Sequence, residues 1–283
     1  QQREAEELKA KMELEKSIEE IKSKTSSDID KFFQILNEYV DTIIKSKTVF
    51  GMLVEGEAGI GKSFSVVSRL KNAGLKHETD WVMLNTHITP MELYEFFWKY
   101  QDKIIVLDDI SNLFEDETKT NILMSALWSA TGKRIINWQS STTKMSAPRE
   151  FAFNGKVIIL TNKVPIHLDT IKSRCFYYEL NFSYGDKIKI LYEIAKVNNI
   201  PMEVVDYIKN ITTPAHTLNF RTLFKINEIH QSQQGNGWEE LANNELRAEP
   251  VRVQFWDIIN NPSYKTRKEQ VAKFIEVSGM SRP

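Results

Sequence analysis

The apolar residues of this chain occur in two patterns, short continuous runs and positions spaced three or four apart. Short runs predict buried strands, and the wider spacing predicts amphipathic helices. The predicted strands cover residues 50–54, 81–84, 103–107, 156–161 and 176–180. Helical spacing follows most of them, as in 118–130, and also precedes the first strand, where Ile29 to Ile43 form an apolar face. This alternation predicts an α/β fold with a parallel five-stranded sheet flanked by helices.

Beyond about residue 182 the pattern becomes helical only. Helices are expected at 186–197, 202–211 and 220–230, and a polar, glycine-containing linker follows at 231–237. We therefore expect four parts. They are a charged helical extension at 1–24, an α/β domain at 25–182, a helical lid at 183–232 and a C-terminal helical segment at 233–283.

Composition narrows the class of protein. Hydrophobic content of 41% and charged content of 27% are usual for globular domains. The formal net charge of -1 does not attract nucleic acid to the protein as a whole. Binding to nucleic acid would therefore need a local patch of positive charge. The single cysteine, Cys175, fits a reducing compartment, and no apolar run approaches the roughly 20 residues that span a bilayer. We expect a soluble cytoplasmic protein with no membrane partner.

The first candidate site is the glycine-rich stretch "GEAGIGKS" at 56–63, which matches G-x-x-x-x-G-K-[ST]. Glycines let successive N–H groups turn into one hollow that holds phosphate oxygens, and the following helix adds positive charge. Lys62 is expected to reach the β- and γ-phosphates of ATP, and Ser63 to hold Mg²⁺. An ordinary glycine turn is the alternative, but a strand before it and a helix after it favour ATP. The predicted phosphate contacts are Gly56, Glu57, Ala58, Gly59, Ile60, Gly61, Lys62, Ser63 and Phe64.

A pair of acids forms the second candidate site. Asp108 and Asp109 end the apolar run "KIIVLDDI". Ligands of open parallel sheets bind at the carboxyl ends of strands. We expect Asp108 to orient the Mg²⁺ shell and Asp109 to polarise an attacking water. An acidic turn after a core strand is the alternative.

With these two motifs the chain resembles the AAA+ P-loop ATPases over about residues 28–232. That family carries a polar residue at the end of the strand between the P-loop and acidic strands, and "VIILTN" has Asn162 there. "IKSRCFYYEL" supplies Arg174 where the family has an arginine finger. The helical lid of the family carries another arginine, called sensor 2, at the start of its third helix, and "TLNFRTLFKINEI" supplies Arg221 there. The resemblance implies a homo-oligomer, a hexameric ring in which Arg174 acts on the neighbouring subunit's ATP. Alternatively, Arg174 pairs with a nearby acid and Arg221 is an ordinary arginine of an amphipathic helix.

One position departs from the family pattern. The second acid is usually Glu, and here it is Asp109, whose side chain is one methylene shorter. We therefore expect slow hydrolysis by the isolated protein, or hydrolysis that depends on assembly.

An insert before the fourth strand resembles a further feature of one AAA+ branch. Residues 134–138 alternate like a strand, and 150–153 could return antiparallel to them. Phage and plasmid replication-type ATPases, helicases and loaders carry such a hairpin before the strand that ends in the polar residue, here Asn162. This resemblance implies a bacterial, archaeal or phage-infected cell. The resemblance implies DNA contacts by Lys144 and Arg149, with Trp138 or Met145 as an apolar neighbour. A plain surface hairpin, with Trp138 packed against its own strand, is equally compatible with the sequence.

The C-terminus resembles the start of a helix-turn-helix. Thr266 and Glu269 predict a capped helix, Gly279 a turn, and Ser281 the start of another helix. Residues 251–283 hold six Lys and Arg against three Asp and Glu. A terminal amphipathic helix explains the pattern equally well.

Together these features predict an ATP-hydrolysing AAA+ ring that acts on DNA as a replication or mobile-element helicase, initiator or loader, with another replication protein as a further partner. A protein-remodelling ATPase is the alternative, although the loop "NTHITP" lacks the aromatic residue that such proteins commonly use. An ATP-dependent assembly switch with little turnover is the third, and Asp109 is compatible with it.

Overall fold

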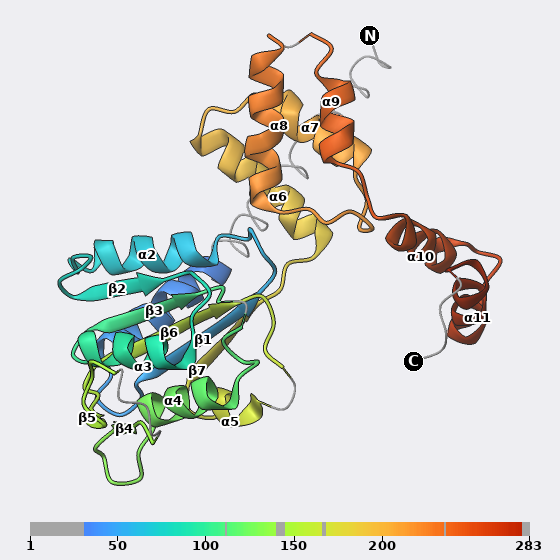
Figure 1. Ribbon diagram of the computed structural model, residues 1–283. Coiled ribbons are helices and arrows are strands. Elements are labelled where there is room, and N and C mark those ends of the chain that lie inside the picture. Colours follow the sequence, from blue (N-terminus) through green and yellow to red (C-terminus); the bar gives the residue numbers. More distant parts are fainter. Residues whose placement is uncertain (1–30, 111, 140–144, 166–167, 235, 279–283) are drawn as a thin grey trace, which may run out of the picture. The chain divides into compact units, whose positions relative to one another are not determined.

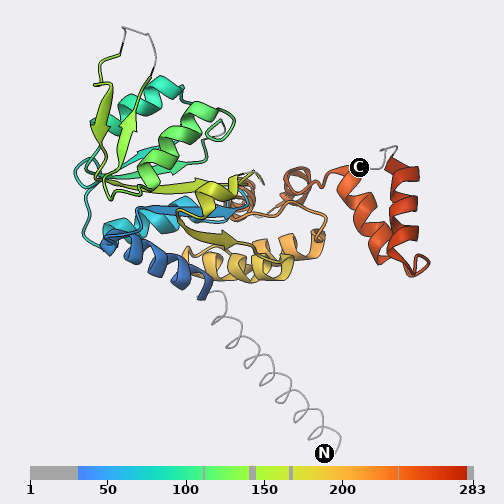
Figure 2. The same ribbon diagram turned by 90° about the horizontal axis from the view of Figure 1, so that it is seen from below.

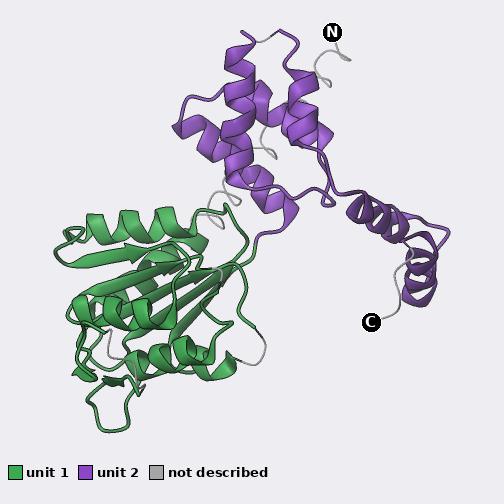
Figure 3. Ribbon diagram, in the orientation of Figure 1, with its two compact units in different colours: residues 1–181 green, residues 182–283 purple. Residues whose placement is uncertain are grey.

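The computed structural model (Figure 1) describes residues 31–110, 112–139, 145–165, 168–234 and 236–278. The expected extension at 1–24 lies outside these residues. The chain divides into two compact units, residues 1–181 and 182–283 (Figure 3). The finer division expected near residue 232 stays a prediction.

A five-stranded parallel sheet forms the centre of the first unit, in the order β2-β3-β6-β1-β7. The strands are β1 (Gly51–Gly56), β2 (Trp81–Leu84), β3 (Ile104–Asp108), β6 (Lys156–Thr161) and β7 (Phe176–Leu180). The predicted α/β sheet is confirmed, and β2, β6 and β7 have the predicted bounds. Strand β1 reaches Gly56 rather than Val54, because it pairs with β6 and β7 on both sides.

Helices cover both faces of this sheet (Figure 2). The helix of residues 31–45 and α2 (Lys62–Asn72) lie on one face, and α3 (Pro90–Lys99) and α4 (Glu117–Leu127) lie on the other. The apolar residues of β3 and β6 are buried between these layers. Burial on both faces explains why the strands are continuous apolar runs rather than alternating ones.

Local capping sets where two of these helices begin. Thr89 and Glu92 form a reciprocal capping box at α3, and Pro90 occupies its first turn. The Asp116 side chain caps α4. Helix α4 ends at Leu127 instead of Ala130, since Trp128 is already extended, with ψ 148°. A short helix, α5 (Asp169–Lys172), was not predicted.

The predicted hairpin forms a separate two-stranded antiparallel sheet of β4 (Ile135–Asn137) and β5 (Glu150–Ala152). Trp138 and Met145 are partly buried against the core of the first unit. Their packing against the core gives these two residues a structural role, and whether either also lies beside a DNA contact stays a prediction. Lys144 lies outside the described residues.

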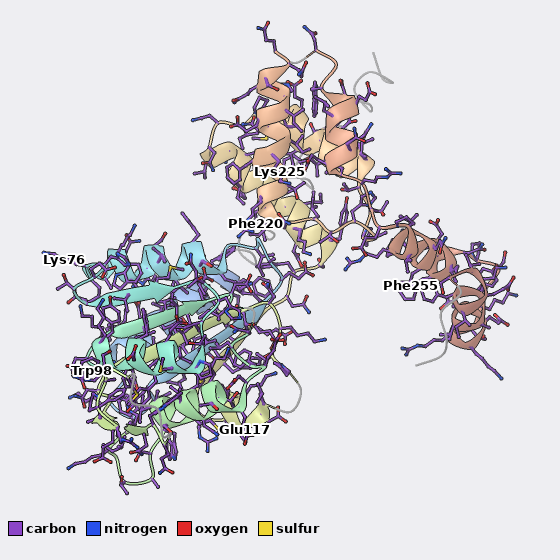
Figure 4. All side chains as sticks on the ribbon, in the orientation of Figure 1. Lys76, Trp98, Glu117, Phe220, Lys225 and Phe255 are labelled. Carbon is purple, nitrogen blue, oxygen red and sulfur yellow. The ribbon has the colours of Figure 1, made fainter. Side chains whose placement is uncertain are left out.

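In the second unit, every element that the structure describes is a helix. Its helices are α6 (Tyr184–Val197), α7 (Met202–Ile211), α8 (Phe220–Ser232), α9 (Glu239–Glu245), α10 (Pro250–Asn260) and α11 (Arg267–Ser278). The segment beginning at Trp238 therefore holds three helices over its described residues, which end at residue 278. Phe255 of α10 (Figure 4) packs against Phe274 of α11, with ring centroids 5.2 Å apart.

The predicted cap of the last helix is present, because Thr266 and Glu269 exchange hydrogen bonds. Gly279 and Ser281, where the turn and the next helix were expected, lie outside the described residues. None of the helices that the structure describes is both long and apolar enough to cross a bilayer.

Candidate functional site

The loop between β1 and α2 needs its glycines for two different reasons. A Cβ on Gly56 would lie 2.6 Å from the Leu180 carbonyl oxygen and 2.8 Å from Ile60 Cδ1, so no side chain fits there. Gly61 has φ 89°, in the left-handed region that glycine adopts without strain. Gly61 directly precedes α2, so bare backbone lies at the start of this helix, where free N–H groups attract anions.

Lys62 is the first residue of α2 and is almost fully buried, with its side chain against the glycine loop. Its Nζ donates hydrogen bonds to the carbonyl oxygens of Gly56 (2.5 Å) and Glu57 (2.8 Å), and to Asn162 Oδ1 (3.0 Å). Lys62 and Asn162 are 100 residues apart in the sequence. They meet because β6 lies directly beside β1 in the sheet.

Two acids from the end of β3 complete the group. Ser63 Oγ donates to Asp108 Oδ1 at 2.7 Å, and Asn162 Nδ2 donates to Asp109 Oδ1 at 2.8 Å. The Asp109 amide donates to the Leu160 carbonyl at 2.9 Å, which holds this residue against β6. The structure thus brings together Lys62, Ser63 and Asn162 with both predicted acids.

The Ser63 hydroxyl and the Asp108 carboxylate fit a Mg²⁺ site. Magnesium takes oxygen ligands and is usually held by one or two protein groups together with water and substrate phosphates. The 2.7 Å contact places two such oxygens side by side, directly after the glycine loop. Beside them, residues that follow β3 and β6, among them Asp109, Asn162 and Lys163, line a pocket.

Comparisons with known proteins agree with this architecture. No protein-family model matches the sequence. The structure of a RuvB variant from Thermotoga maritima matches with a TM-score of 0.50 at 11% identity, covering 89% of this chain and 82% of that one. Cdc6p from Pyrobaculum aerophilum matches with a TM-score of 0.51 at 13% identity, covering 88% and 79%.

The chain has the AAA+ P-loop ATPase fold. The fold class predicted from the motifs is thereby confirmed. An uncharacterized 36.7 kDa protein from the nrdC-mobD intergenic region of Enterobacteria phage T4 is 23% identical in an alignment over 257 residues, and the match covers 81% of this chain and 77% of that protein.

The other predicted residues of the AAA+ site lie on separate elements. Arg174 follows α5 and its Nη1 donates to the Thr170 carbonyl at 2.6 Å. Arg221 is exposed in the first turn of α8, in the second unit. Their roles stay predictions.

The remaining predicted contacts differ in exposure. Glu57 and Ala58 are exposed in the glycine loop, Ile60 is buried, and the Phe64 side chain is 78% exposed on α2. Arg149 is exposed immediately before β5. For Glu57, Ala58, Ile60 and Phe64 the expected phosphate contact involves backbone N–H groups, so their side-chain exposure does not decide it.

Sequence reasoning missed Glu55, the residue directly before Gly56. Glu55 accepts hydrogen bonds from the Val164 amide (3.1 Å) and the Tyr177 hydroxyl (2.8 Å), and Lys172 Nζ lies 3.5 Å from its Oε2. A charged residue near the end of an otherwise apolar strand was the available signal, because charges are rarely buried without partners.

Proposed function

We propose that this chain is an ATP-hydrolysing AAA+ protein that works as a ring of identical subunits and acts on DNA. One observation carries the ATPase part of the proposal. Lys62, Asn162 and Asp109 form a continuous chain of hydrogen bonds, next to the contact between Ser63 and Asp108. These are the groups that phosphoryl transfer needs in one place.

The loop and the start of α2 would bind the phosphates. Backbone N–H groups of residues 56–64 and the helix N-terminus would face the phosphate oxygens, and Lys62 would pair with the β- and γ-phosphates. Ser63 and Asp108 would hold Mg²⁺. When bound, the ion would neutralise charge on the phosphate oxygens.

Asp109 and Asn162 would act on the attacking water. The water oxygen forms a bond to the γ-phosphorus, the bond from that phosphorus to the bridging oxygen of ADP breaks, and the water proton passes to the Asp109 carboxylate. Asn162 would orient both the water and the γ-phosphate. Arg174 of the neighbouring subunit, and Arg221 of the lid, would stabilise charge that spreads over the transferred group.

The DNA part of the proposal rests on the hairpin. A paired and anchored hairpin before the Asn162 strand is the feature by which the chain resembles replication-type AAA+ proteins. The exposed Arg149 directly precedes β5, and Lys144 falls between β4 and β5 in the sequence. If both contact phosphates, replacing either with Ala should lower the salt dependence of DNA binding by a slope of about 1.

The deciding experiment measures ATPase rate and assembly mass, with and without single- and double-stranded DNA. We expect ATP-dependent assembly and turnover that DNA increases. Lys62→Ala should abolish ATP binding, whereas Lys71→Ala, an exposed change in the last turn of α2, should not.

Other outcomes would redirect the proposal. If neither DNA changes the rate or the mass, the DNA part is wrong. Unfolding of a tagged protein would favour a protein-remodelling ATPase. Assembly on ATP without turnover would favour a nucleotide switch.

A further inference from the structure

Glu55 of β1 contacts three other parts of the first unit: the segment after β6, strand β7 and helix α5. It is the last residue of β1 before Gly56, and its neighbours in the sheet are Thr161 on β6 and Glu179 on β7. Only 16% of its side chain is exposed. A carboxylate this well covered needs several partners to balance the loss of water.

The two oxygens of Glu55 contact different segments. Oε1 accepts the Val164 amide at 3.1 Å, two residues beyond Asn162. Oε2 accepts the Tyr177 hydroxyl at 2.8 Å and lies 3.5 Å from Lys172 Nζ. Lys172 is the last residue of α5, two positions before Arg174.

The partners of Glu55 stabilise its ionised form. Burial raises the pKa of Glu55, but hydrogen bonds from the Val164 amide and Tyr177, together with the nearby Lys172, outweigh burial and lower it overall. Burial and the same carboxylate raise the pKa of Tyr177. The Lys172 Nζ also lies 4.5 Å from the centre of the Tyr177 ring. Glu55 is therefore ionised at neutral pH and holds its partners as a charged group.

We propose that Glu55 is a positioning residue for the ATP hydrolysis proposed above, on which this inference rests. It fixes the backbone that follows Asn162 through one oxygen, and the α5 turn that carries Arg174 through the other. Glu55 thereby fixes the positions of Asn162 and Arg174 relative to the glycine loop. In the proposed mechanism, Asn162 orients the water and Arg174 serves the next subunit. Glu55 itself touches no reacting atom, so its loss should lower turnover while ATP binding persists.

The test compares Glu55→Gln with Glu179→Gln in the full chain. Glu179 occupies the same register on β7 but is exposed, and lies 3.4 Å from the Tyr177 hydroxyl. For Glu55→Gln we expect kcat to fall by about tenfold or more, with the ATP Kd unchanged within about twofold. Tyr177→Phe should show a smaller fall in kcat of the same kind. Glu179→Gln should retain wild-type values.

A double-mutant cycle separates positioning from a general loss of structure. If Glu55 acts through Asn162 and through the α5 turn, adding Glu55→Gln to Asn162→Ala or to Arg174→Ala should lower kcat by less than the product of the two single effects. Fully multiplying effects in both cycles would overturn the proposal, as would a rise of the ATP Kd in step with the fall of kcat. If Glu55→Gln does not fold, the cycle of Tyr177→Phe with Arg174→Ala decides, because Tyr177 shares Glu55 Oε2 with Lys172 of α5.

The two proposals fail differently. A wild-type chain that binds ATP and assembles but never hydrolyses it contradicts the proposed function, and the role of Glu55 with it. A wild-type chain that hydrolyses ATP while Glu55→Gln does so equally well contradicts this inference alone.

Discussion

The backbone at Asp109 limits which acid can follow Asp108. Asp109 has φ 50°, in the left-handed region, and is held there by its amide bond to Leu160. Asp and Asn tolerate this conformation better than residues with longer side chains, because their short polar groups can hydrogen-bond locally. The backbone therefore gives a reason for Asp where the AAA+ family usually has Glu.

Asp109→Asn should remove the charge without disturbing this backbone. Asn adopts the same φ and can still accept the hydrogen bond from Asn162. We expect the ATPase rate to fall by about 100-fold or more, the range that a general base contributes, with ATP affinity nearly unchanged. Steady-state turnover and equilibrium binding measure the two. The exposed Asp102→Asn serves as control, and an unchanged rate in Asp109→Asn would show that Asp109 is not the base.

Gly56→Ala tests the close approach of backbone to β7. A Cβ would meet the Leu180 carbonyl at 2.6 Å, an atom that cannot move independently of the strand. We expect the free energy of unfolding to fall by about 1–3 kcal/mol, as overpacking does, and ATP affinity to fall as well. Gly185→Ala in α6, where the closest atom would be 3.8 Å away, should leave stability equal or slightly higher. Urea denaturation measures the free energy of unfolding of both variants. An equal decrease in the two would contradict this prediction.

Helix α3 anchors the hairpin through both of its limbs. The Tyr94 ring lies 5.4 Å from the Trp138 ring and 5.2 Å from the Phe151 ring, and its hydroxyl donates to the Pro148 carbonyl at 2.7 Å. Glu95 accepts both the amide and the hydroxyl of Ser146, each at 2.7 Å. The hairpin therefore depends on α3, so a displacement of α3 would carry the hairpin with it.

The contact between Glu95 and Ser146 should weaken in acid. The Ser146 amide and hydroxyl lower the pKa of Glu95 below its usual 4.5. A lowered pKa means that this stabilisation is complete above about pH 4.5 and is lost as pH falls through the folded-state pKa. Hydrogen exchange of the Ser146 amide should lose protection in that window. Glu95→Gln should show no such pH dependence, and identical behaviour of the two proteins would contradict the assignment.

The candidate ATP site is incomplete within one subunit if Arg174 serves the neighbouring one. Arg174 turns to the Thr170 carbonyl of its own α5, while Lys62, Asp109 and Asn162 are joined by hydrogen bonds. A finger arginine is worth about 10³–10⁵ in rate. Hydrolysis would then be a property of the assembly rather than of the chain alone.

Mixing two inactive variants tests this division. Lys62→Ala should not bind ATP but keeps Arg174, whereas Arg174→Ala should bind ATP but lacks the finger. Each alone should show almost no turnover, and a mixture should recover a measurable part of the wild-type rate. As a control, Arg174→Ala is mixed with a double variant that carries both Asp109→Asn and Arg174→Ala. This mixture should recover no turnover, because neither protein supplies Arg174. No recovery in the first mixture, despite joint assembly, would show that Arg174 does not act between subunits.

Local features of the sequence determined the elements and half of the site. The apolar runs and the stretch from Gly56 to Ser63 each act within a few residues of the chain, so they could be interpreted without the fold. They predicted the α/β class, most strand bounds and the position of the candidate phosphate loop.

Only the tertiary structure decided which distant residues meet. The strand order puts β6 between β3 and β1, so Asn162 reaches Asp109 and Lys62, 53 and 100 residues away. The tertiary structure also gives the Glu55 carboxylate its partners, and it packs Trp138 of the separate hairpin beside Tyr94 of α3. No periodicity encodes these contacts, because they depend on the path of the chain between the strands and on the close packing of side chains from separate elements.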